Sequence, residues 1–221
     1  GLEGKGHGVM IKNAGKIESI GEGSIAICGE GKYNGAGVYF SHGIVTSQSD
    51  QAFISIKGIA GGSNFKGITM LSENDQIGGA LTTASISLIV NTLNLKGAIQ
   101  GAGELHILSA TPNRSIELGG ETNGNEELPS LQITSIDQTY LVDGFSKICI
   151  GSKNSKGQLK ISDISIFNDS MELNCGRLYV LNPLMTTTAG ADIVIFTDHL
   201  IFGPNGEITP SGELKLQRKT S

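Results

Sequence analysis

Short stretches in which apolar and polar residues alternate run along most of the chain. In the segments SIAICG, FISIKG and SISLIV nearly every second residue is apolar, which is the period of a half-buried β-strand. No stretch long enough for an ordinary helix shows apolar residues at helical spacing together with a cap. The nearest helical candidate is SIDQTYLVDGF, where Ile136 and Tyr140 are four apart and a single turn would close at Gly144. The pattern predicts an all-β protein.

The alternating stretches recur at a fixed period in the first third of the chain. The segments GVMI, GVYF and GITM begin at Gly8, Gly37 and Gly67, so their starts are almost equally spaced. The segments SIAICG and FISIKG end at Gly29 and Gly58, with the same spacing. Both series have a period of roughly 29 residues, and each unit carries two or three short strands in the same order.

A second repeat joins the middle of the chain to its last part. Apolar residues, glycines and a Gly-Glu-Leu of residues 86–107 match those of residues 193–216. The offset between matching positions is constant up to Pro204 and Asn205, and it is constant again, but larger by these two residues, after them. A constant offset, changed once by an insertion at a turn, indicates an internal repeat.

Short strands at a fixed period, without crossover helices, predict a solenoid in which equivalent strands pair in parallel. At about 25 to 30 residues per coil, the chain would form roughly eight coils. We expect glycine-rich coils of about 29 residues in 1–80 and further coils in 81–221, within one continuous solenoid. A two-sheet sandwich also has alternating strands, but it has no reason to keep a regular period along the chain.

The phase of the alternation predicts which residues face the core in ladders of like side chains. The predicted core residues are Ile25, Ile27, Ile54, Ile56, Ile86, Leu88, Leu93, Leu95, Leu105, Ile107, Ile148, Ile150, Ile193, Ile195, Leu214 and Leu216.

Composition and charge narrow the possible functions. The 32 glycines among 221 residues are about 14% of the chain, roughly twice the average usage, and they suit tight corners between strands. The formal net charge is −5 and no cluster of Lys and Arg occurs, which argues against nucleic-acid binding. Apolar runs long enough to span a membrane are absent, and the segment GLEGKGHGVM lacks the apolar core of a signal peptide. An exported protein would then have lost its signal or carry it upstream.

The order of the segments LNLKGAIQGAGELHILSATP, SIELGG and YLVDGFSKICIGSKNSKGQLKI resembles repeats of filamentous-haemagglutinin-like bacterial exoproteins and adhesins. The glycine-rich units such as GVYFSHGIVTSQSDQAFISIKGIAGG look like repeats of the same family. The likeness covers most of Gly8 to Gln217. It implies a right-handed parallel β-helix, a secreted or cell-surface location, and a role as a rod that holds adhesive regions away from the cell.

Parallel β-helices also include polysaccharide lyases and hydrolases, which need carboxylates gathered on one face. The aspartates are instead scattered, and we interpret them as surface or turn residues: Asp50, Asp75, Asp137, Asp143, Asp163, Asp169, Asp192 and Asp198. Glu126 and Glu127 are the only adjacent acidic pair, and they lie in the polar loop Gly119–Pro129. This loop is the first choice for a segment that projects and binds a partner.

The remaining reactive residue types do not form a recognisable motif. His7, His42, His106 and His199 lie near no nucleophilic Ser or Cys in the sequence, and His106 has the outward phase of its strand. The segment GEGKYNG lacks the P-loop spacing and reads as a corner, and calcium-binding nonapeptides are missing. We therefore expect no catalytic residues and no cofactor.

The cysteines predict three unpaired thiols. The chain has an odd number of cysteines, which are Cys28, Cys149 and Cys175. The apolar residues on either side of Cys149 point it away from the core, whereas Cys175 shares its phase with Leu173 and points inward. Residues on opposite faces cannot be bridged. Metal binding is not expected, because the chain has no CxxC or HxxxH spacing.

The sequence favours a non-enzymatic structural or adhesive module of a large bacterial surface or secreted protein. The alternatives are a filament subunit whose copies stack end to end and a carbohydrate-active β-helix enzyme. The expected partners are further coils, of the parent chain or of other copies, and host or surface glycans or proteins. Neither terminus offers an amphipathic helix to cap the solenoid, so the terminal coils are expected to meet further coils.

Overall fold

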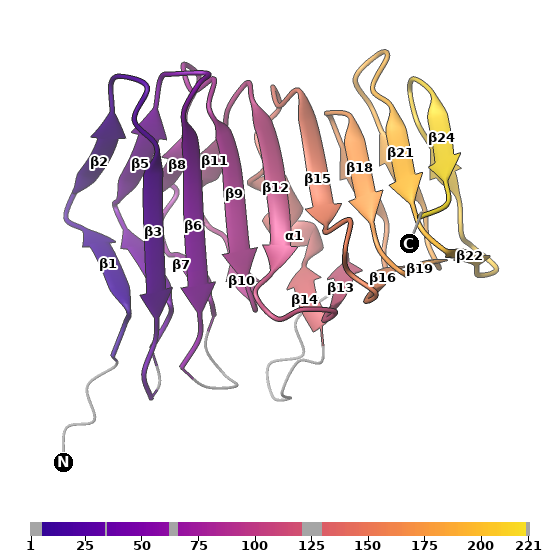
Figure 1. Cartoon of the computed structure of the whole chain (residues 1–221), viewed down its shortest axis with the longest axis horizontal. Coiled ribbons are helices and arrows are strands. Elements are labelled where there is room, and N and C mark those ends of the chain that lie inside the picture. The colour runs from indigo at the N-terminus through magenta and orange to yellow at the C-terminus, as the bar shows by residue number, and fades with distance from the viewer. Residues whose placement is uncertain (1–5, 34, 62–65, 121–129, 220–221) are drawn as a thin grey trace.

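The computed structural model describes residues 6–33, 35–61, 66–120 and 130–219. Within these ranges the chain forms 24 β-strands and one short helix. The paired strands are parallel, and they stack side by side along one long axis (Figure 1). The protein is therefore all-β with long parallel sheets, an arrangement compatible with a β-solenoid.

The first part of the chain visits three sheets in turn and then returns to the first. After the first three strands, the fourth strand lies beside the first, so that sheet neighbours are three strands apart in the sequence. One sheet contains β1 (Val9–Lys12), β4 (Val38–Ser41), β7 (Ile68–Met70) and β10 (Leu93–Asn94). A second contains β2 (Lys16–Ser19), β5 (Ile44–Ser47), β8 (Gln76–Gly78) and β11 (Ala98–Gln100).

The third sheet has eight strands and continues through the whole described chain (Figure 1). We call it the long sheet. It includes strands from both sides of residue 80. Its strands are β3 (Ile25–Glu30), β6 (Phe53–Ile59), β9 (Ser85–Val90), β12 (Glu104–Ser109), β15 (Lys147–Gly151), β18 (Met171–Asn174), β21 (Ile193–Phe196) and β24 (Leu214–Gln217).

Two further sheets accompany the second half of the long sheet. The five-stranded one contains, in spatial order, β14 (Ser130–Ile133), β13 (Ser115–Leu118), β16 (Gln158–Ile161), β19 (Arg177–Val180) and β22 (His199–Phe202). The other contains β17 (Ser165–Phe167), β20 (Leu184–Thr186) and β23 (Ile208–Thr209). In the five-stranded sheet β14 lies outside β13, although it follows β13 in the sequence.

The strand register confirms the short repeat and shows where it changes. Ile25 pairs with Ile54, and Val9 pairs with Val38, which is the spacing that the first units predicted. In the last part of the chain Ile193 pairs with Leu214, a clearly shorter separation. The expected coil length is therefore right for the first units and too long for the last ones.

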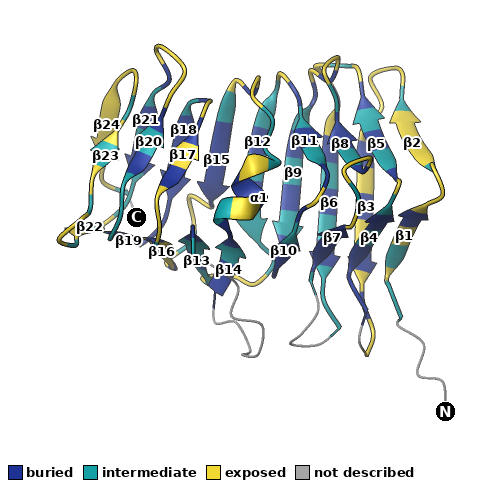
Figure 2. Ribbon diagram, turned by 180° about the vertical axis from the view of Figure 1, so that it is seen from behind, coloured by how far each residue is buried: buried dark blue, intermediate teal, exposed yellow. Residues whose placement is uncertain are grey.

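The core consists of apolar ladders, as the alternation predicted. Of the 16 predicted core residues, 14 are buried, and their side chains belong to one continuous cluster. Leu214 and Leu216 are the exceptions, with 41% and 55% exposure. Their phase was correct, because they pair with Ile193 and Ile195, but β24 is the last strand of the long sheet and nothing described packs beyond it. Figure 2 shows this end with mostly exposed residues on β22 and β24.

The expected helical turn is present as α1 (Ser135–Thr139). Thr134 caps it, because its hydroxyl accepts a hydrogen bond from the backbone of Asp137 and the Asp137 carboxylate accepts one from the backbone of Thr134. The same carboxylate accepts a hydrogen bond from the Leu95 backbone at 2.9 Å, which ties α1 to the end of β10. The helix ends at Thr139, with Tyr140 as its C-cap, and does not extend to Gly144. In the described ranges, no helix has the length and apolar character needed to cross a membrane.

Candidate functional site

The outer face of the long sheet carries one row in which reactive side chains lie side by side. Strand register fixes this row, because each residue is the direct partner of the next on the neighbouring strand. In order, the row consists of Ala26, Ser55, Ser87, His106, Cys149, Glu172, Val194 and Lys215. An imidazole, a thiol and a carboxylate therefore occupy three consecutive strands near the middle of the sheet.

Two residues of an adjacent outer row complete the group. Glu104 lies two positions before His106 on β12, and its register partner on β15 is Lys147. Residues two apart on a strand share a face. We call Glu104, His106, Lys147, Cys149 and Glu172 the outer-face cluster.

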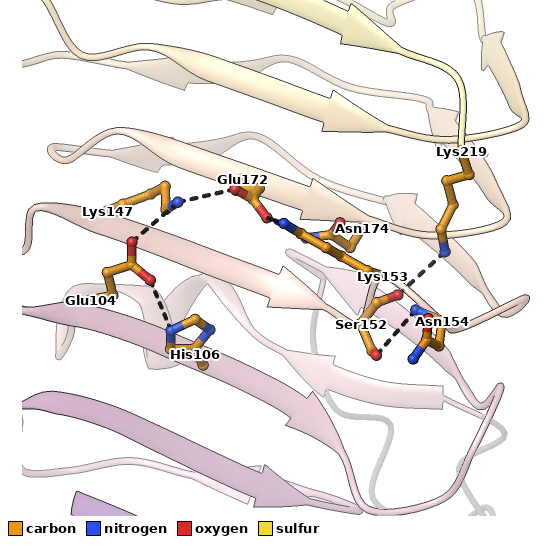
Figure 3. A network of polar contacts seen from close by, with 9 residues as sticks. All are labelled: Glu104, His106, Lys147, Ser152, Lys153, Asn154, Glu172, Asn174 and Lys219. Atoms are coloured by element: carbon orange, nitrogen blue, oxygen red, sulfur yellow. Dashed lines mark hydrogen bonds and ion pairs between the residues drawn. The ribbon is translucent and has the colours of Figure 1, made fainter. Parts of the chain in front are cut away.

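Ion pairs connect the cluster across three strands (Figure 3). Glu104 contacts His106 Nε2 at 3.0 Å and Lys147 Nζ at 3.2 Å. The Lys147 ammonium also donates to Glu172 at 3.0 Å. Glu172 in turn accepts a hydrogen bond of 2.9 Å from the Asn174 amide. Lys147 thus bridges two carboxylates that belong to strands on either side of it.

The cluster changes the protonation behaviour of its members. Partial burial opposes the charge on Lys147, but hydrogen bonds to Glu172 and Glu104 outweigh it and raise the pKa of the ammonium above its ordinary value. Partial burial also opposes the charge on Glu172, yet hydrogen bonds from Asn174 and Lys147 hold the pKa of its carboxyl below the usual range. Burial raises the pKa of the Cys149 thiol to about 11, so the free thiol is protonated at neutral pH.

Three members of the cluster have the atoms and the proximity to hold a metal ion. One ligand atom each from Glu104, His106 and Cys149 lie within 4.8 Å of one another. Lys147 and Glu172 are already paired with each other and flank this group.

The sequence did not indicate this cluster. His106 and Cys149 are far apart along the chain, and the polar loop and α1 lie between them, so no short spacing connects them. Their proximity follows only from the register between β12 and β15. The alternation did give the outward phase of both residues. That phase is the one signal in the sequence that could have pointed to the pair.

The cysteines remain unpaired and Cys175 lies in the core, as predicted, but Cys149 is more buried than its outward phase suggested. Cys28 is exposed on β3, whereas Cys149 and Cys175 are both buried. Cys149 does lie on the outer side of the long sheet, yet only 3% of it is exposed, because its row neighbours His106 and Glu172 flank it closely. His106 was expected to be exposed and is half-buried beside Glu104.

The aspartates mainly hold turns, and several are more buried than surface residues would be. Asp75 is fully buried and accepts hydrogen bonds from the backbones of Gly43, Leu71 and Ser72 at 2.8 to 2.9 Å. Asp169 is also buried, and its carboxylate accepts a hydrogen bond from the backbone of Gly144. These contacts satisfy backbone donors at corners of the chain path.

Four further aspartates have simple surroundings. Asp192 is half-buried and accepts a hydrogen bond from the backbone of Glu213, and Asp163 accepts one from its neighbour Ile164. Asp143 and Asp198 are exposed. The pair Glu126 and Glu127, and most of the loop Gly119–Pro129, lie outside the described residues.

A separate cavity of about 450 Å³ lies beside α1. Its polar lining includes Lys66, Asp137 and Asp163. Burial lowers the pKa of Lys66, against the opposing effect of the Asp137 charge. Asp137 is already bonded to Thr134 and to the Leu95 backbone, so its carboxylate holds the helix rather than pointing free into the cavity. The outer-face cluster is therefore the stronger candidate for chemistry.

Comparisons with protein-family models, with curated proteins and with solved structures gave no match to this chain.

Proposed function

We propose that this chain is a non-enzymatic structural or adhesive module of a large bacterial cell-surface or secreted protein. We further propose that its sheets close around the core as a right-handed parallel β-helix. The observation that carries the proposal is the continuous long sheet of eight parallel strands, of which those from β3 to β21 bury one unbroken apolar cluster on their inner side. The resemblance of the repeats to filamentous-haemagglutinin-like exoproteins supplies the proposed location.

The proposed spacer function follows from the length and stiffness of a stack of hydrogen-bonded strands. Each strand adds about 4.8 Å along the stack, so eight strands give a body on the order of 35 Å long. Every interior strand is hydrogen-bonded to a neighbour on each side, and its inward side chains pack on those of the next strand. Such a body resists bending, and its length grows with the number of repeats. These are the properties of a spacer that presents binding regions at a distance.

The location is tested on the bacterium that encodes the chain. Antibodies against the folded chain should label intact cells or detect the protein in the culture medium. Brief protease treatment of intact cells should remove the cell-bound signal, while a cytoplasmic marker should survive. Labelling that requires permeabilised cells would overturn the proposed location.

The absence of enzymatic activity is tested with a panel of polysaccharides. The chain should release no sugars or unsaturated products, with or without calcium. Saturable turnover that is abolished by changing one carboxylate would replace the structural proposal with a carbohydrate-active enzyme.

The exposed apolar residues of the last strands favour a second candidate, a subunit that stacks end to end. Ile201 and Phe202 on β22, and Leu214 and Leu216 on β24, are between 41% and 55% exposed. Both strands are at the edges of their sheets and therefore present unpaired backbone groups. A second copy would cover both kinds of surface at once.

Stacking is tested by sedimentation velocity over a range of concentrations. The unmodified chain should associate, and Leu214→Lys with Leu216→Lys should shift it toward the monomer. Ile164→Lys is the matched control, because Ile164 is exposed elsewhere on the surface. A strict monomer at high concentration, with equal hydrogen-exchange protection in terminal and central strands, would contradict stacking.

A further inference from the structure

We propose that Glu104, His106 and Cys149 form a binding site for one divalent transition-metal ion of the zinc class on the outer face of the long sheet. This proposal does not depend on the module's location or on its adhesive role. It rests on the proximity of three ligand atoms, which all lie within 4.8 Å of one another.

The donor set selects the class of metal. A thiolate, an imidazole nitrogen and a carboxylate oxygen are the ligands that Zn²⁺ binds at about 2.0 to 2.3 Å. Ca²⁺ and Mg²⁺ prefer oxygen ligands and would gain little from a thiolate and an imidazole. Three protein ligands leave a fourth tetrahedral position, which a water molecule would fill.

The sheet holds the ligands close to the required geometry. His106 and Cys149 are direct register partners on β12 and β15, and Glu104 is on the same face of β12. Tetrahedral ligands at zinc distances lie on the order of 3.5 Å apart, so the three atoms, which lie within 4.8 Å of one another, must approach by up to about 1.3 Å. The side chains of Glu104 and His106 are 39% and 35% exposed, and they have room for this small rotation.

The charges around the site balance after the ion enters. The ion enters from water, the Cys149 thiol loses its proton to solvent, and bound water is released. The thiolate and the Glu104 carboxylate then neutralise the two positive charges of the metal. Glu104 exchanges its contacts to His106 and Lys147 for the metal, and Lys147 keeps its ion pair with Glu172 at 3.0 Å. One proton is therefore released for each ion bound.

The experiment uses the untagged full chain in reduced form. Cys28→Ser provides the background, because Cys28 is exposed and would bind metals by itself. Cobalt(II) serves as the spectroscopic probe, followed by competition with zinc. We expect one equivalent of cobalt, a thiolate-to-cobalt charge-transfer absorption, loss of that absorption when zinc is added, and release of about one proton per ion in weakly buffered solution.

Variants in the same background assign the ligands. Cys149→Ser should abolish the charge-transfer absorption, and His106→Gln and Glu104→Gln should each weaken binding. The expected loss exceeds about a hundredfold for Cys149→Ser, since changes outside the ligand shell alone cost about 10- to 100-fold. Cys175→Ser is the matched control, because Cys175 is equally buried but belongs to no ligand group among the described residues.

The result has two readings. Cobalt absorption that survives in Cys175→Ser and disappears in Cys149→Ser supports the site. Absence of cobalt absorption in the background protein, or binding that Cys149→Ser leaves unchanged, overturns it. Circular dichroism and urea unfolding show whether each variant is folded. If Cys149→Ser does not fold, the loss of cobalt binding in His106→Gln and Glu104→Gln tests the site instead.

Discussion

The inner and outer faces of the long sheet are built by the same eight strands, yet the two faces present different kinds of side chain. The two inner rows that run through all eight strands contain only Ile, Leu or Met, and they begin at Ile25 and Ile27 and end at Leu214 and Leu216. The outer row between them runs from Ala26 to Lys215 and includes an imidazole, a thiol and a carboxylate. The strands impose the spacing on both faces, but only the inner face must be apolar.

The difference shows which part of a repeat is constrained. An inward side chain packs against the same position on both neighbouring strands, so a polar residue there would be buried without a partner. An outward side chain meets solvent or other side chains of its own face. Chemistry can therefore be added to the outer rows without disturbing the ladders. The following predictions test how separate the two faces are.

The largest expected effect is the loss of an interior ladder residue. Ile195→Ala should reduce the free energy of unfolding by about 2 to 5 kcal/mol, because Ile195 is fully buried between Leu173 and Leu216. Leu216→Ala is the matched comparison, since Leu216 is in the same row but 55% exposed, and it should cost under about 1 kcal/mol. Urea unfolding measures both. A loss under about half a kcal/mol for Ile195→Ala would mean that the ladder is not the main source of stability.

A somewhat smaller effect is expected at a buried corner. Asp75→Ala leaves the backbone N–H groups of Gly43, Leu71 and Ser72 without their carboxylate partner. The free energy of unfolding should fall by about 1 to 3 kcal/mol, because the N–H of buried Gly43 cannot form a hydrogen bond with water instead. The control is Asp50→Ala at an exposed position, which should stay within about 0.5 kcal/mol of the unmodified chain. Equal effects would show that this buried carboxylate does not support the corner.

The outer face should contribute less, and in a pH-dependent way. Glu172→Gln removes the charge that pairs with Lys147 and should cost about 1 to 2 kcal/mol at pH 7. The folded pKa of Glu172 lies below its unfolded value, so its contribution is present above about pH 4.3 and is lost as the pH falls through the folded pKa. The difference in unfolding free energy between the two proteins should therefore shrink toward zero in acid. A difference that stays constant down to pH 2 would show that the carboxylate acts through packing alone.

The smallest effect concerns reactivity rather than stability. Cys28 should react with a water-soluble disulfide reagent at once, because it is exposed. Cys149 and Cys175 should react only slowly, since burial raises the pKa of each thiol to about 11. One fast thiol and two that react after denaturation are expected, as counted by mass spectrometry. Rapid reaction of Cys149 would indicate that the outer face opens easily.

The sequence predicted the inner face well because its rule is local. Alternation gave the phase of residues such as Ile54 and Ile148, and the repeats gave the sheet neighbours of the first units. It failed at Leu214 and Leu216, because burial there depends on what packs beyond the strand and not on phase. The single turn at α1 was foreseen, but its end at Thr139 was not. Its connection to Leu95 was not foreseen either, because that contact joins residues far apart in the sequence.

The outer-face cluster could not be predicted from the sequence in the same way. Its existence depends on the register of β15 against β12, and the segment between His106 and Cys149 includes an unusually long connection. Composition and short motifs contain no information on that register. Only the outward phase of the two residues was visible in the sequence.

The position of β14 has a consequence for how the protein folds. Nearly every other strand docks on a partner that precedes it in the sequence, so the sheets extend one strand at a time as the chain becomes available. β13 differs, because its neighbour on that side is β14, which follows it. The edge of β13 that faces the earlier part of the molecule therefore stays unpaired until residue 133 is present and β14 has joined it. We expect this insertion to be the slow kinetic step of folding, with the strands before β13 protected from hydrogen exchange earlier than those after it.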